Sequence, residues 1–134
     1  MMSTVAKSRL YGIMMTLYLG AVVVLCFANL GAGPAQNSFW GIPGDKIAHF
    51  LLFLPFPFLA WGCTRPREET VPYILIKIFL IFLLGLLLGF LTEYIQGYLP
   101  GRCRERLDFL ADFCGITATC LGIVILKLCR EKDE

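Results

Sequence analysis

Four long apolar segments, separated by short polar stretches, make up most of this chain. Each is close to the length of about 20 residues that a helix needs to cross the hydrocarbon core of a bilayer. Glycine, proline and charged residues gather between the segments, where a chain turns. We therefore predict an all-α integral membrane bundle of four transmembrane helices, in one domain over residues 1–134, with spans at about 10–28, 45–63, 72–96 and 108–128.

The first apolar segment has two interpretations, a cleaved signal peptide or a retained helix. A signal peptide has an apolar region of about 7–15 residues before a run of small residues, such as the one at 31–35. The segment at 10–28 is longer than that. Gly12, Thr16 and Gly20 also give it a small-residue face for helix packing. We expect the segment to be retained.

Proline and glycine predict two breaks in the first half of the chain. Residues 29–44 are rich in Gly, Pro, Asn and Ser, which predicts a loop. Pro55 and Pro57 lie inside the second span, where each removes a backbone donor and favours a kink. Such a kink is tolerated in a membrane where neighbouring helices supply partners for the freed carbonyls.

The composition agrees with a membrane protein and argues against a nucleic-acid partner. Hydrophobic residues make up 57% of the chain and charged residues 16%, against about 45–50% and about 25% in soluble domains. The net charge of +2 is too small for a nucleic-acid surface. None of the six cysteines forms a CxxC pair, and five lie in or beside apolar segments, so we expect free thiols.

The basic residues between the spans predict the orientation, because short cytoplasmic loops carry an excess of Lys and Arg. Seven of them share one side of a four-span bundle: Lys7, Arg9, Arg65, Arg67, Lys127, Arg130 and Lys132. Four share the other side: Lys46, Arg102, Arg104 and Arg106. Both termini are therefore predicted to be cytoplasmic.

Polar and small residues form one face on each of the last two spans. At about 100° per residue, one sector of the third span holds Gly85, Gly89, Thr92, Glu93 and Gln96. One sector of the fourth span holds Asp108, Asp112, Gly115, Thr119 and Gly122. The glycines permit close backbone approach, so we expect the two faces to pack together.

That packing predicts a polar pocket on the non-cytoplasmic side. Asp45 and His49 are four residues apart on the second span and therefore share a face at the same end. The predicted binding residues are Asp45, Lys46, His49, Glu93, Gln96, Arg102, Asp108 and Asp112. His49 and Glu93 are the candidates for a catalytic role.

The same residues also have a purely structural interpretation, in which Lys46 and Arg102 neutralise the carboxylates and the network only holds three helices together. A zinc site usually has several His or Cys ligands and this chain has one His, so we expect no metal. We also expect no cofactor. Arg104 and Arg106 suit a solvated, lipid-facing pair.

Four short motifs occur in order between residues 45 and 112: DKxxHF from Asp45, TExxQ from Thr92, PGR from Pro100 and DxxxD from Asp108. Together they resemble the VanZ-like family of small bacterial membrane proteins, over residues 45–122. The family pattern usually has Asn at the position of Asp112, so this chain carries an extra carboxylate there. The resemblance implies a multi-pass cell-membrane protein and, from the family's namesake, a link to reduced susceptibility to teicoplanin.

Three functions are compatible with these observations. The first is a non-enzymatic envelope protein whose pocket binds an anionic lipid or a lipid-linked cell-wall intermediate, because guanidinium groups bind phosphate bidentately. The second is a membrane enzyme that acts on a lipid-linked or peptidoglycan substrate with His49 and Glu93 as an acid–base pair, although no nucleophile motif supports a named reaction. The third, proton-coupled transport, needs polar groups further along the helices. We expect the first; whether the chain forms a homo-oligomer is left open.

Overall fold

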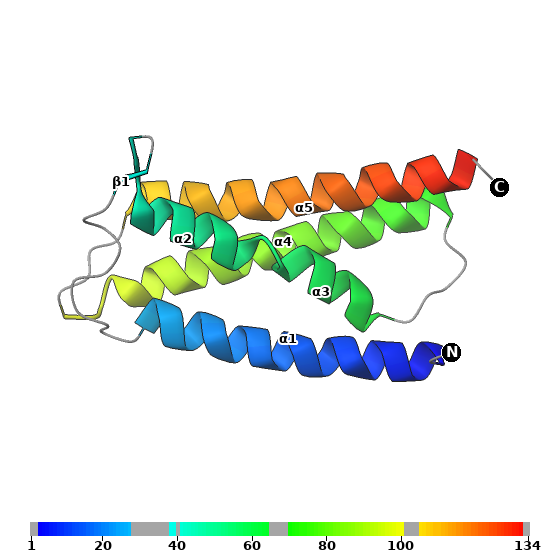
Figure 1. Ribbon diagram of the computed structural model, residues 1–134, viewed down its shortest axis with the longest axis horizontal. Helices are drawn as coiled ribbons and strands as arrows, with labels where there is room; N and C mark the ends of the chain where they lie inside the picture. The colour runs from blue at the N-terminus through cyan, green and yellow to red at the C-terminus, as the bar shows by residue number, and fades with distance from the viewer. Residues whose placement is uncertain (1–2, 28–37, 40, 65–69, 101–104, 133–134) are drawn as a thin grey trace.

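The computed structural model describes residues 3–27, 38–39, 41–64, 70–100 and 105–132. It is a bundle of helices with a short β-hairpin at one end (Figure 1). The elements are α1 (Thr4–Phe27), β1 (Ser38–Phe39), β2 (Ile42–Pro43), α2 (Gly44–Phe53), α3 (Phe56–Cys63), α4 (Val71–Gln96) and α5 (Arg106–Lys132). With α2 and α3 taken as one broken segment, the described residues contain four helical segments long and apolar enough to cross a membrane, as predicted.

The bundle has two ends with different contents (Figure 1). The hairpin end holds β1 and β2, the starts of α2 and α5, and the end of α4. At the opposite end, α1 begins and α5 ends. The two termini therefore lie at the same end, as four spans require. Which end faces the cytoplasm stays a prediction.

The predicted kink in the second span is a break between α2 and α3. Pro55 precedes α3, and Pro57 lies in its first turn. The carbonyl of Leu52 accepts a hydrogen bond from the Tyr18 hydroxyl, and the carbonyl of Leu54 accepts one from Thr119 Oγ1. Side chains of α1 and α5 thus supply partners to the backbone at the break, which is how a broken helix stays satisfied in an apolar environment.

A two-stranded hairpin replaces part of the predicted loop at 29–44. Its strands are antiparallel, with Ser38 opposite Pro43 and Phe39 opposite Ile42. Gly41 has φ of 79°, a left-handed conformation that glycine adopts without the strain other residues incur. The loop prediction missed this hairpin because two-residue strands leave no alternating pattern to detect. Residues 28–37 and 40 lie outside the described residues.

The core lies where α2, α4 and α5 meet. Phe53 and Ile116 are fully buried there, and the cluster is completed by Ile74, Ile78, Cys120 and Ile123. Helix α1 packs mainly on α3 and has two buried residues, Val22 and Cys26. Large apolar side chains are exposed on every long helical segment, as a bundle surrounded by lipid requires. The five described cysteines are free thiols, as expected.

Glycines allow close helix contacts, and the two predicted polar faces meet at Gly89 and Asp112. The prediction was wrong for Gly115 and Thr119 of the second face, which contact the second span instead. A Cβ at Gly89 would lie 3.3 Å from Asp112, and one at Gly85 would lie 3.1 Å from Ile116 and Phe56. The closest approach to a neighbouring helix backbone is between α5 and α2, where a Cβ at Gly115 would lie 2.5 Å from the Phe50 carbonyl oxygen. Only glycine allows this approach.

We predict that Gly115→Ala lowers the free energy of unfolding by about 1–3 kcal/mol, the usual cost of overpacking, because the Phe50 backbone has to move. Gly122→Ala in the same helix is the matched control, since a Cβ there meets nothing within 4 Å. Alanine's higher helix propensity should make the control neutral or stabilising by up to about 1 kcal/mol. The free energy of unfolding of both variants is measured in mixed micelles. Equal values would contradict the close contact at Gly115.

Candidate functional site

Apart from Lys77, the buried ionisable side chains of the described residues gather at the hairpin end, because three helix termini meet there (Figure 1). Helix α2 begins at Gly44, α5 begins at Arg106 and α4 ends at Gln96. Residues within two turns of these termini therefore lie at a common depth. Six of the eight predicted binding residues contribute to one cluster: Asp45, Lys46, His49, Glu93, Asp108 and Asp112.

The part of the cluster nearest the helix termini is the lysine tier, formed by Asp45, Lys46, Glu105 and Asp108. Lys46 Nζ donates to Asp45 Oδ2 at 2.8 Å, to Glu105 Oε2 at 2.5 Å and to Asp108 Oδ1. The Lys46 side chain is 11% exposed. Three carboxylates thus compensate the cost of removing this ammonium from water, and they use all three of its donors.

The deeper part is the histidine tier, formed by His49, Glu93 and Asp112. His49 Nδ1 lies 2.9 Å from Asp112 Oδ1 and 3.8 Å from Glu93 Oε1. His49 Nε2 faces Asp108 Oδ2 at 3.9 Å, which connects the two tiers. One ligand-type atom from each of the three residues lies within 4.8 Å of the other two.

The histidine tier is deeply buried and incompletely satisfied. Asp112 is 0% exposed and Glu93 is 4% exposed. Glu93 Oε2 accepts a hydrogen bond from the Glu105 amide at 3.4 Å. Glu93 Oε1 and Asp112 Oδ2, by contrast, are buried without a hydrogen-bond partner in the described structure. Buried carboxylate oxygens in this state are rare in folded proteins, because each one costs free energy.

One predicted binding residue does not join the cluster, and another lies outside the described residues. The Gln96 amide donates to the Cys26 carbonyl at 2.9 Å, so Gln96 ties α4 to α1 instead. Sequence reasoning missed this because the carbonyl belongs to the backbone of α1, 70 residues earlier. Arg102 lies outside the described residues, as does Arg104.

Glu105 is a member of the cluster that sequence reasoning passed over. It stands between Arg104 and Arg106, a context that predicts local, solvated pairing. Its position directly before α5 instead lets its carboxylate accept from Lys46 Nζ and its backbone amide donate to Glu93 Oε2. The start of α5, predicted near Asp108, was two residues late, and this concealed the role of Glu105.

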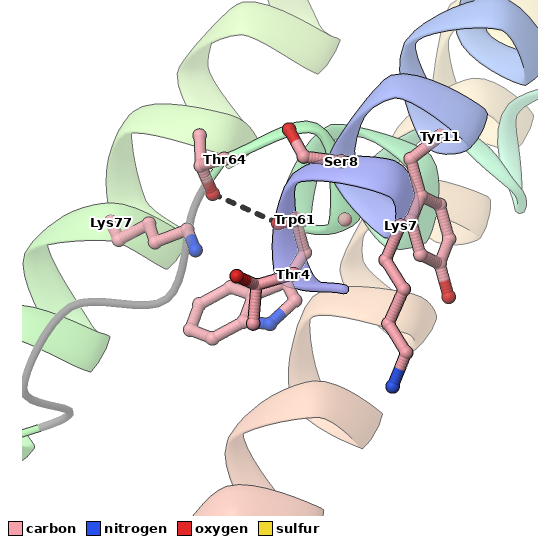
Figure 2. A pocket seen from close by; sticks show the side chains of 8 residues that line it. Thr4, Lys7, Ser8, Tyr11, Trp61, Thr64 and Lys77 are labelled. Atoms are coloured by element: carbon pink, nitrogen blue, oxygen red, sulfur yellow. Dashed lines mark hydrogen bonds between the residues drawn. The ribbon is translucent and has the colours of Figure 1, made fainter. Parts of the chain in front are cut away.

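A second polar region lies at the opposite end of the bundle (Figure 2). It is a cavity of about 190 Å³ lined by Thr4, Lys7, Ser8, Tyr11, Trp61, Gly62, Thr64 and Lys77. Lys77 Nζ lies 3.6 Å from the centroid of a Trp61 ring, and Lys127 Nζ lies 5.4 Å from one, both cation–π distances. The Lys77 side chain thus ends on an aromatic ring. The two polar regions are at opposite ends of the helices.

Comparison with known proteins adds no relative to these observations. No family model, curated protein or solved structure matches the chain. What the chain does has to be argued from the hairpin-end cluster itself.

We predict that Lys46→Met lowers the free energy of unfolding by roughly 1–3 kcal/mol. This is less than the 3–5 kcal/mol typical of breaking a fully buried ion pair, because Glu105 is half exposed. The loss follows from leaving three carboxylates close together without a cation. Lys7→Met, the same change at an exposed lysine of α1, should stay within about 0.5 kcal/mol of wild type. Thermal unfolding in one detergent compares the two variants. Similar shifts of their melting temperatures from the wild-type value would contradict the lysine tier as described.

Proposed function

We propose that this chain is a VanZ-like multi-pass protein of the bacterial cell envelope. In this proposal its hairpin-end cluster binds, without catalysis, the head group of an anionic lipid or of a lipid-linked cell-wall intermediate. The observation that carries the proposal is the convergence of residues from separate motifs. DKxxHF supplies Asp45, Lys46 and His49, TExxQ supplies Glu93, and DxxxD supplies Asp108 and Asp112.

The unpartnered oxygens favour binding over a purely structural network. A network that only held helices together would satisfy its own members, since a partly satisfied buried network is less stable than an apolar core. Glu93 Oε1 and Asp112 Oδ2 lack hydrogen-bond partners in the described structure. They are acceptors, and a bound molecule with donor groups or positive charge would complete them.

The charges of the cluster refine the expected head group. Lys46 is engaged by three carboxylates, which leaves it no donor for an anion. Arg106 is exposed in the first turn of α5, where the unpaired amides and the helix dipole also favour an anion. A head group that carries both phosphate and hydroxyl or amine groups fits this arrangement, with its phosphate at Arg106 and its donors toward the carboxylates.

Location and phenotype belong to the same proposal. The excess of basic residues on the side of the termini supports a hairpin end on the non-cytoplasmic face of the cell membrane, where cell-wall intermediates are used. The motif resemblance supports a link to teicoplanin susceptibility. Expression of the chain in a susceptible host is the direct way to look for that phenotype.

An enzyme is the second candidate, and one contact favours it. Asp112 Oδ1 holds His49 Nδ1 at 2.9 Å, the arrangement by which a carboxylate orients a general base. Glu93 stands beside the pair as an acid. In this alternative the substrate is the same lipid-linked or peptidoglycan intermediate, and its covalent structure changes.

Arg106→Ala should weaken binding of a polyprenyl phosphate by about tenfold or more, because a hydrogen bond from a charged donor contributes about 1.5–3 kcal/mol. Arg9→Ala is the matched control, since Arg9 is exposed in α1 near the opposite end. Native mass spectrometry of protein in nanodiscs that contain the polyprenyl phosphate measures both variants.

Equal binding by the two arginine variants would contradict a head-group site at the hairpin end. The same spectra separate the two candidates. In the binding proposal, a lipid-linked cell-wall intermediate offered to the wild-type protein keeps its mass. If the wild-type protein converts the intermediate to a product and the Glu93→Gln variant does not, the enzyme hypothesis would replace the binding proposal.

A further inference from the structure

The histidine tier has the composition of a metal site. Each tier contains a group of three residues able to hold an ion, Asp45, Glu105 and Asp108 in one and His49, Glu93 and Asp112 in the other. In the lysine tier the Lys46 ammonium already occupies the centre of its three carboxylates. No Lys or Arg among the described residues forms an ion pair with Glu93 or Asp112.

We propose that His49, Glu93 and Asp112 bind a divalent metal ion between α2, α4 and α5. Two carboxylates and one imidazole are ligands that Zn²⁺ and Mn²⁺ accept. The two negative charges of Glu93 and Asp112 equal the charge of one such ion, so binding removes the cost of burying them. This departs from the sequence-based expectation of no metal, which counted only His and Cys.

The ligand geometry needs little adjustment. Ligand atoms about 2.0–2.2 Å from one ion lie up to about 4.4 Å apart. The distances from His49 Nδ1 are 2.9 Å to Asp112 Oδ1 and 3.8 Å to Glu93 Oε1. One ligand atom from each of the three residues lies within 4.8 Å of the other two. A shift of less than about 1 Å brings them into range.

The two unpartnered oxygens are the independent observation that points to a ligand here. Glu93 Oε1 and Asp112 Oδ2 are buried beyond nine-tenths and have no hydrogen-bond partner in the described structure. Asp112 Oδ2 lies close against α4, since a Cβ at Gly89 would lie 3.3 Å from it. A metal ion bound by Glu93 Oε1 and by both carboxylate oxygens of Asp112 would supply the missing partners.

Neighbouring groups orient the three ligands as surrounding residues do in metal sites. A metal-bound imidazole usually donates from its other nitrogen to a carboxylate. His49 Nε2 faces Asp108 Oδ2, and Asp108 is held in turn by Lys46. The Glu105 amide binds Glu93 Oε2, which leaves Oε1 toward His49. Three protein ligands leave at least one coordination position for water or another ligand.

The cation site does not depend on the lipid ligand proposed above, and its test uses metal ions alone. The protein is produced without a polyhistidine tag, stripped with a chelator and titrated with Mn²⁺, which binds thiols weakly and so avoids the free cysteines. The chain contains one His, so imidazole nitrogen coupling in the pulsed electron paramagnetic resonance spectrum of bound Mn²⁺ identifies His49 without any variant.

We expect one bound Mn²⁺ per chain with imidazole nitrogen coupling, and displacement by Zn²⁺, which binds such ligands more tightly. His49→Gln should abolish the coupling, and Asp112→Asn should weaken Mn²⁺ binding by about tenfold or more. Glu131→Gln, in the last turn of α5, is the matched control for an acidic residue elsewhere and should bind as wild type does.

Two results with the wild-type protein would overturn the proposal: bound Mn²⁺ that shows no nitrogen coupling, or no binding of Mn²⁺ and Zn²⁺ at millimolar concentration. Both are measured without a variant, so they hold even where a variant fails to fold. Either result would leave the lipid-binding proposal intact, because that experiment requires no metal.

Discussion

The cost of placing ionisable side chains inside an apolar bundle is the constraint on which the rest of this structure depends. An unpaired charge away from water costs several kcal/mol, so such groups have to share partners. At the hairpin end, α2, α4 and α5 meet this requirement together: Lys46 bonds three carboxylates, and His49 stands among three. None of the three helices could keep its own buried charges without the other two, so the cluster fixes how they pack.

The packing of the backbone and the arrangement of the cluster support each other. Gly115 lets α5 approach the Phe50 carbonyl of α2, and Gly89 lets Asp112 lie against α4. These close approaches bring Asp112 within hydrogen-bonding distance of His49. Asp108 then joins the two tiers, because one of its oxygens meets Lys46 and the other faces His49. Glu93 Oε1 and Asp112 Oδ2 have no hydrogen-bond partner among the described residues, and they mark the place where a ligand or metal ion is expected.

Much of the fold could be predicted from the sequence, because segment length and Pro55 and Pro57 are local signals. The packing face predicted on the first span was wrong, since a Cβ at Gly12 or Gly20 meets nothing within 4 Å. Six residues of the site could be placed from local signals too, since helical spacing sets which side chains share a depth. Gln96 could not be placed, because its partner is a backbone carbonyl of α1, and Glu105 was passed over because the start of α5 was put too late. The division of the cluster into two tiers needed the relative rotation of three helices, which no single segment encodes.

The central claim is that His49 and Asp112 hold α2 and α5 together inside the bundle. A double-mutant cycle tests it most directly, with the free energy of unfolding measured for wild type, His49→Ala, Asp112→Ala and the double variant in the same mixed micelles and without added metal. Contacting residues in one buried network are typically coupled by about 0.5–3 kcal/mol, and we expect at least about 1 kcal/mol here. Additive losses, within about 0.3 kcal/mol, would mean that the two side chains do not meet and would contradict the account.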